Sequence, residues 1–349
     1  MNVIPERTLA RRAFAEDALC DHDLTIDVAS ADASFRSYWR VSGAHGTRIV
    51  MDAPPSMEDI EPWLDIGARL RAAGLHTPQV FAVDHTQGFV LMEDLGVRTY
   101  LPELNAGSVD ALYADALVAL VRMQTHADTT GLAPFDHAFL SMEMDLLPEW
   151  FLKCHLAFVV GAVEREIIAA AFAFLAQSAT EQPQTFMHRD YHSRNLLIVD
   201  AHSHGVETSI LRNPGIIDFQ GALVGPIAYD LASLLRDCYI EWDAALVERW
   251  MESQRRRLVR AGLISADVDT QQFGRWFDLI GLQRHIKVLG IFCRLWYRDG
   301  KDQYLADLPL VWRYVISVAR RYPELASFVA VLERARGRRD ITLAREAGA

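Results

Sequence analysis

The spacing of hydrophobic and polar positions changes along the chain after about residue 95. Before that point, short β-favouring runs alternate with turns. The predicted strands cover residues 35–41, 48–51, 79–83 and 88–92. One helix is predicted over about residues 58–73, because apolar positions recur there at helical spacing and Gly74 follows as a stop signal. This region therefore predicts a small antiparallel sheet of four or five strands with one helix.

Beyond residue 95 the pattern is mostly helical. Predicted helices cover residues 109–125, 143–160 and 163–176, and most of the last 120 residues also show helical spacing. Short apolar strands are predicted at residues 185–187, 196–199 and 215–217. A chain of 349 residues is long enough for two lobes. We place the smaller N-lobe at residues 1–95 and the C-lobe at residues 96–349.

The composition argues against some classes of binding partner. The chain has 35 Lys and Arg residues against 46 Asp and Glu residues, a net charge of −11, which argues against a broad nucleic-acid-binding surface. The longest apolar run, residues 167–176, is much shorter than a membrane span. The four cysteines form no CxxC pair, and residues 1–12 do not have the pattern of a signal peptide. We expect a cytoplasmic protein with neither a nucleic-acid nor a membrane partner.

One stretch carries a recognisable chemistry. Asp190 lies five positions before Asn195, in a predicted loop that leads into an apolar strand, and a second apolar strand ends at Asp218. Transfer of a phosphoryl group from ATP needs a carboxylate that accepts a proton, together with oxygen ligands that hold Mg²⁺. The alternative is that the three residues only shape turns and cap a loop.

These residues resemble the His-Arg-Asp-x-x-x-x-Asn and Asp-Phe-Gly signatures of kinases. Gln220 after Phe219, and the Tyr-Asp-Leu-Ala run at 229–232, are more similar to aminoglycoside phosphotransferases and choline-kinase-like enzymes. Within that branch, segments 31–36, 50–55, 188–195 and 283–290 resemble the anomeric sugar kinases of cell-wall recycling.

The resemblance implies an α+β, bilobal protein-kinase-like fold with a small antiparallel-sheet N-lobe and a mostly helical C-lobe. It implies ATP and Mg²⁺, and phosphorylation of the O1 hydroxyl of N-acetylmuramate and N-acetylglucosamine to an α-1-phosphate. A uridylyltransferase would then use this product in peptidoglycan recycling. Two alternatives stay open: a kinase for aminoglycosides or another small alcohol, and a nucleotide-binding protein without transferase activity.

Carried over by position, Asp190 is the general base and Asn195 and Asp218 are the Mg²⁺ ligands, with His188 and Asp230 bracing the loop. The resemblance places ATP against Ser34 and Phe35, and against the segment at the kinase hinge. That segment contains Met92, Glu93 and Leu95, and its spacing alone is equally typical of an ordinary strand end.

Two features depart from the kinase pattern. Residues 30–35, where a glycine-rich loop would cover the phosphates, contain no glycine, and Met51 occupies the position of the usual phosphate-pairing lysine. Arg36, Arg40 and Arg48 are candidates to replace that charge, or are simply exposed strand residues.

A predicted helix around residues 282–295 suggests the substrate. Its cations Arg284, Lys287 and Arg294 fall within about an 80° arc at 100° per residue. With Arg194 and Arg298, they are our candidates to receive an anionic sugar such as N-acetylmuramate. A solvated helix face is the alternative for each of them. The acidic positions Glu143, Asp145 and Glu149 would instead suit a cationic aminoglycoside.

Overall fold

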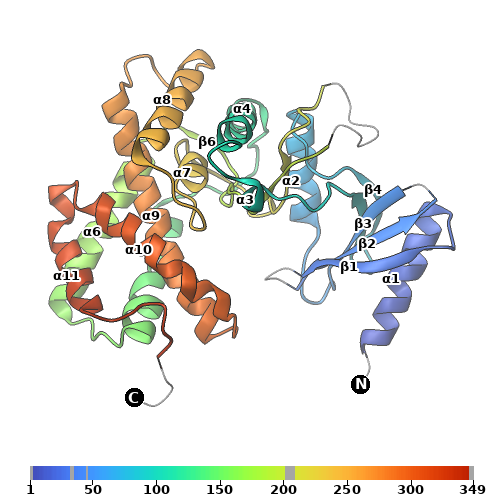
Figure 1. The fold of residues 1–349 in the computed structure, drawn as a ribbon, viewed down its shortest axis with the longest axis horizontal. Coiled ribbons are helices and arrows are strands. Elements are labelled where there is room, and N and C mark those ends of the chain that lie inside the picture. Colours follow the sequence, from blue (N-terminus) through green and yellow to red (C-terminus); the bar gives the residue numbers. More distant parts are fainter. Residues whose placement is uncertain (1–2, 32–34, 45, 201–208, 346–349) are drawn as a thin grey trace. The chain divides into compact units, whose positions relative to one another are not determined.

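The computed structural model describes residues 3–31, 35–44, 46–200 and 209–345 (Figure 1). It consists of two compact units: unit 1 is Met1–Ala119 with Arg194–Gly221, and unit 2 is Leu120–Ser193 with Ala222–Ala349. This division differs from the predicted boundary after residue 95. The reason is that strands near residues 197 and 215 bridge to Thr99 and His76, so that this later segment packs in unit 1.

Unit 1 is built on a five-stranded sheet in the order β1-β2-β3-β5-β4, in which every pairing is antiparallel. This confirms the predicted antiparallel sheet, although α1 and β1 were not predicted. Its elements are α1 (Val3–Leu19), β1 (Thr25–Ala31), β2 (Ser37–Gly43), β3 (Gly46–Asp52), α2 (Glu61–Ala72), β4 (Val80–Asp84), β5 (Phe89–Glu93), α3 (Tyr100–Glu103), β7 (Leu196–Leu197) and β8 (Gly215–Ile216). Helix α4 (Val109–His126) begins in unit 1 and ends in unit 2.

Side chains alternate along a strand, so the two faces of the sheet have different surroundings. Val41, Val50 and Leu91 pack with Ala15 of α1 in one apolar cluster, and Figure 1 shows α1 running along the sheet. In the register of the sheet, Arg40 of β2 lies opposite Ile49 of β3, and Ile49 lies opposite Met92 of β5. This second row faces away from α1 and lines a cavity.

Unit 2 is mostly helical, as predicted. Its elements are α5 (His137–Met144), the π-helical segment η1 (Leu147–His155), α6 (Ala162–Thr180), β6 (Gln184–Met187), β9 (Leu223–Pro226), α7 (Tyr229–Leu235), α8 (Ala244–Arg260), α9 (Thr270–Tyr297), the 3-10 segments η2 (Asp302–Asp307) and η3 (Pro323–Leu325), α10 (Leu308–Ala319) and α11 (Ala326–Arg336). Helix α9 starts at the N-cap Asp269, whose side chain accepts a hydrogen bond from the Gln272 amide. It contacts α6, α7, α10 and η1, and most of its residues are buried.

The predicted helix over residues 143–160 is wrong. The structure has α5, which is capped by Asp136 and ends at Met144, and then the separate segment η1. Pro148 lies in the first turn of η1, and a proline there has no backbone N–H with which to continue the preceding helix. Helix α9 approaches this segment closely at Gly290, because a Cβ on Gly290 would lie 2.4 Å from the Leu146 backbone. Among the residues that the structure describes, no helix is long and apolar enough to cross a membrane.

Candidate active site

Unit 1 contains a cavity of about 370 Å³ on the sheet face opposite α1. The end of β5 forms part of its wall, and Met92, Glu93 and Leu95 from the predicted hinge all line it. Apolar side chains from other elements complete this wall, among them Ile49, Leu197 and Ile217. A slot of apolar side chains beside the polar end of a strand suits a planar aromatic base.

The carboxylate of Glu93 is held in place by its neighbours. It lies 3.0 Å from Nε2 of His76 and 3.9 Å from the guanidinium of Arg71, and it accepts a hydrogen bond from the Gln79 amide. Burial acts to raise the pKa of Glu93, but His76, the Gln79 amide and the charge of Arg71 together outweigh it and lower the pKa. The side chain therefore fixes the end of β5.

Arg40 lines the same cavity, where it is paired with an acidic side chain. Its guanidinium forms two hydrogen bonds with the Asp94 carboxylate, at 2.6 and 3.0 Å, and both residues line the cavity. Of the three arginines suggested as replacements for the missing lysine, only Arg40 lines the cavity in the described part of the chain. Arg48 instead donates to the Thr47 carbonyl and stacks on the Phe81 ring, and Met51 is buried.

The two predicted metal ligands lie next to each other on the wall of this cavity. Nδ2 of Asn195 is 3.2 Å from one carboxylate oxygen of Asp218, and Nε2 of Gln220 is 2.6 Å from the other. Asp218 has a positive φ of 61°, which turns the chain sharply after β8. The next residue, Phe219, packs on Trp63 of α2 with ring centroids 5.2 Å apart, and this contact anchors the turn.

This pair fits a magnesium ion. A carboxylate and an amide supply the hard oxygen atoms that Mg²⁺ prefers, and the ion usually takes only one or two ligands from the protein. Phe35 is not part of the cavity wall: its side chain is exposed, and its amide donates to the Glu58 carboxylate. Ser34 lies outside the described residues.

In unit 2 the loop that carries Asp190 is held from behind. The buried carboxylate of Asp230 accepts hydrogen bonds from the amides of His188, at 2.7 Å, and Arg189, at 3.0 Å. Arg189 has a φ of 76°, in the left-handed region that a non-glycine residue rarely adopts. Further along, Asp237 accepts a hydrogen bond from the Ser193 amide at 3.0 Å. These contacts fix the loop on both sides of Asp190.

Positive charges surround Asp190. Burial acts to raise its pKa, but Lys287, His192, Arg189 and Arg284 outweigh it, so that the pKa lies below the usual aspartate value. The Asp190 side chain is therefore ionised at neutral pH. An ionised carboxylate is the form that can accept a proton from a hydroxyl group.

Two predicted substrate residues are buried and already have partners. Lys287, 7% exposed, lies 2.9 Å from the carboxylate of Glu143, which also receives a hydrogen bond from Arg189 at 2.7 Å. Arg284, 4% exposed, donates to the Cys238 sulfur at 3.1 Å. Neither residue belongs to a solvated helix face.

The other predicted cations differ from these two. Arg298 is exposed and pairs with Asp299 at 2.7 Å, and Arg194 is half-buried and does not line the cavity of unit 1. Arg294 is half-buried, and its Nε has no hydrogen-bond partner within the described ranges. Burial and the charge of Arg298 lower the pKa of Arg294, which means that its charge is poorly compensated.

The roles of three acidic residues at these sites were not predicted from the sequence. Glu143 was considered only as a partner for a cationic substrate, and Asp94 and Asp237 were not considered as partners of Arg40 and Ser193. Asp237 is 44 positions from Ser193 and Glu143 is 46 from Arg189, so no local pattern indicates these contacts.

Comparisons with known proteins agree with this arrangement. Residues 25–263 match the model of the phosphotransferase enzyme family. Two curated relatives are named N-acetylmuramate/N-acetylglucosamine kinase. The one from Pseudomonas aeruginosa is 40% identical, over 87% of this chain and 86% of the relative. The one from Pseudomonas putida is 38% identical, over 86% of each.

Solved structures show the same fold at low identity. A putative aminoglycoside phosphotransferase from Ralstonia eutropha has a TM-score of 0.60 and 14% identity, over 89% of this chain and 98% of that one. A choline/ethanolamine kinase family protein from Mesorhizobium loti has a TM-score of 0.60 and 14% identity, over 94% and 99%. The chain therefore belongs to the phosphotransferase enzyme family, and it is an ATP-dependent phosphotransferase that uses a hydroxyl group as its acceptor.

Proposed function

We propose that this protein phosphorylates the anomeric O1 hydroxyl of N-acetylmuramate and N-acetylglucosamine, with ATP as the donor. The observation that carries the proposal is the set of three relatives with that kinase name, which are 35–40% identical over at least 86% of both chains. The α-1-phosphate product would be passed to a uridylyltransferase in peptidoglycan recycling. We propose a cytoplasmic location, where ATP is available.

Asp190 is the proton acceptor in this proposal. An anomeric O1–H belongs to a hemiacetal and is more acidic than an ordinary alcohol, so a weakly basic carboxylate suffices. The lowered pKa of Asp190 suits this task, because the surrounding cations keep it ionised. Asp230 and Asp237 act as positioning residues, since they bind the backbone of the loop on either side of Asp190.

Nucleotide binding is assigned to the cavity of unit 1. Met92, Glu93 and Leu95 would lie against adenine, and Arg40 would supply the charge that Met51 lacks. Asn195 and Asp218 would hold Mg²⁺, which when bound neutralises the charge on the phosphate oxygens. Ser34 stays a proposed phosphate contact, on the family resemblance alone.

Arg294 is the best candidate to bind the lactyl carboxylate of N-acetylmuramate. It follows Lys287 by seven residues on α9, which returns it to nearly the same helix face about 10 Å further along. Lys287 and Arg284 already have partners and contribute to the pKa of Asp190, whereas the charge of Arg294 is poorly compensated. Arg194 and Arg298 remain weaker candidates.

A cationic aminoglycoside is a poorer fit. The carboxylate of Glu143 is neutralised by Lys287 and Arg189, and that of Glu149 pairs with Lys153 at 2.9 Å. Two of the three acidic positions that favoured such a substrate are therefore occupied. The solved aminoglycoside phosphotransferases share the fold at 13–15% identity, which does not extend to the substrate.

The test is an ATP-consumption assay with N-acetylmuramate, N-acetylglucosamine and kanamycin, and ³¹P NMR of each product. We expect turnover of both sugars and a phosphate coupled to the anomeric proton. Turnover of kanamycin alone, or a phosphate on another hydroxyl, would contradict the proposal. Asp218→Ala should remove Mg²⁺-dependent ATP binding, measured by calorimetry, and retention of that binding would exclude Asp218 as a ligand.

A further inference from the structure

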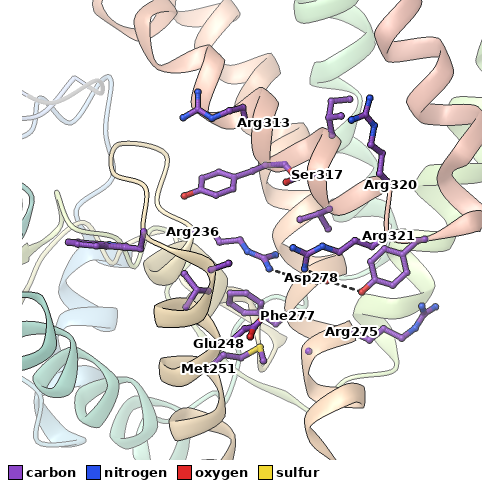
Figure 2. Close-up of a pocket in the computed structure, with 18 of the residues that line it drawn as sticks. Arg236, Glu248, Met251, Arg275, Phe277, Asp278, Arg313, Ser317, Arg320 and Arg321 are labelled. Atoms are coloured by element: carbon purple, nitrogen blue, oxygen red, sulfur yellow. Dashed lines mark hydrogen bonds and ion pairs between the residues drawn. The ribbon is translucent and has the colours of Figure 1, made fainter. Parts of the chain in front are cut away.

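Unit 2 contains a second cavity, whose lining includes none of the residues that we propose for phosphoryl transfer. Its volume is about 790 Å³, and it is lined by residues of α8, α9 and α10, by Arg336 of α11, and by the segments after α7 and α10 (Figure 2). Asp278 lies on its wall and precedes Lys287 by nine residues on α9. Nine residues of α-helix correspond to two and a half turns and about 13 Å, so these two residues are on opposite sides of the helix. The cavity is therefore distinct from the surroundings of Asp190.

The wall of this cavity is positively charged, although the chain as a whole carries −11. Six arginines line it, against the three carboxylates Glu241, Glu248 and Asp278. Figure 2 shows Arg236 and Arg321 meeting at Asp278, with N–O distances of 2.6 and 3.3 Å. One carboxylate thus faces two guanidinium groups, which leaves positive charge there.

The arginines in α10 and directly after it are accessible as well as charged. The side chains of Arg313, Arg320 and Arg321 are 55%, 63% and 53% exposed. Arg313 pairs with Glu241, and Arg320 pairs with Glu333, which does not line the cavity. Planar guanidinium groups bind phosphate oxygens through paired hydrogen bonds, and several of them around one hollow suit a multiply charged anion.

Aromatic side chains give the cavity surfaces for a ring. Trp242, Tyr314 and Tyr322 line it and are half-buried, whereas Phe277 and Trp312 are buried behind the wall. Its volume falls within the usual range for small-molecule sites and is larger than one inorganic phosphate requires. We propose that this cavity binds an organic phosphate, a ring that carries a phosphate monoester, with Arg321 and Arg320 binding the phosphate and the aromatic wall contacting the ring.

The test uses the full-length protein and isothermal titration calorimetry with glucose 6-phosphate. The ATP cavity is kept saturated with a non-hydrolysable ATP analogue and Mg²⁺, so that binding there does not contribute. We expect saturable binding, and affinity for glucose 6-phosphate at least about tenfold higher than for inorganic phosphate or succinate. No binding up to about 10 mM, or equal binding of the three probes, would overturn the proposal.

Arg321→Gln should weaken binding of glucose 6-phosphate by about tenfold or more, because one charged hydrogen-bond donor is lost. The matched control is Arg256→Gln on α8, whose side chain is 64% exposed and pairs with Glu252, away from the cavity. The control should bind like the wild type. Equal affinity in Arg321→Gln and Arg256→Gln would refute the assignment. If Arg321→Gln does not fold, Arg320→Gln serves the same comparison.

Discussion

Replacing Arg294 by glutamine separates the two sugars that we propose as substrates. N-acetylmuramate has a lactyl carboxylate, whereas N-acetylglucosamine has the same ring and O1 hydroxyl without it. Arg294 is half-buried, and its Nε has no partner in the described part of the chain. Burial and the charge of Arg298 lower the pKa of Arg294. An anionic ligand next to Arg294 would supply the negative charge that the protein itself does not place there.

The expected magnitude follows from the kind of bond that is lost. A hydrogen bond to a charged group contributes about 1.5–3 kcal/mol, which corresponds to about a 10- to 100-fold change in affinity. Arg294→Gln should therefore raise the KM for N-acetylmuramate by about that factor and leave the KM for N-acetylglucosamine within about twofold. Stability should not fall, because the change removes a partly buried charge that is poorly compensated.

The assay is steady-state kinetics with each sugar at saturating ATP, with Tm measured for every variant. Arg256→Gln is the matched control, because Arg256 is 64% exposed, pairs with Glu252 and lies on α8. Its KM values should not change for either sugar. An equal rise in KM for both sugars in Arg294→Gln, or no rise for N-acetylmuramate, would refute the assignment of Arg294 to the carboxylate.

Three further predictions concern the base and the central helix. Asp190→Asn should lower kcat by about 10²–10⁴-fold, as for loss of a positioned base, while calorimetry still detects Mg²⁺·ATP binding; near-normal turnover in a folded variant would remove Asp190 from this role. Lys287→Met removes the positive charge with the largest lowering effect on the pKa of Asp190, so the acid limb of the pH profile of kcat/KM should move up by about one pH unit or more. An unchanged acid limb would mean that Lys287 does not lower the pKa of the base. Gly290→Ala should cost about 1–3 kcal/mol in urea unfolding, because its Cβ would lie 2.4 Å from backbone atoms. Gly274→Ala, whose Cβ would lie 3.7 Å from the nearest side chain, should be neutral or stabilising, and similar losses in both would contradict the close-approach argument.

Local sequence patterns determine much of the secondary structure of this protein and indicate part of its candidate site. Strand alternation and turn residues predicted most of the sheet of unit 1, because the period of the side chains and the turn chemistry depend on neighbouring positions. The spacing of Asp190, Asn195 and Asp218 indicated phosphoryl transfer for the same reason: each lies on a short loop next to an apolar strand. Local pattern also has limits, since the spacing did not separate α5 from η1, where Pro148 interrupts the helix.

Only the tertiary structure decided the surroundings of these residues. Arg284 and Lys287 had the spacing of a cationic helix face, yet packing of α9 against its neighbours buries both. Lys287 then pairs with Glu143, which is 144 positions away in the chain. Burial and ion pairing depend on which segments pack together. That packing results from many contacts between residues far apart in the chain, so no local pattern indicates it. The sequence by itself therefore indicated which residues we propose for the chemistry. The fold determined which cations lower the pKa of Asp190, and it left the charge of Arg294 poorly compensated.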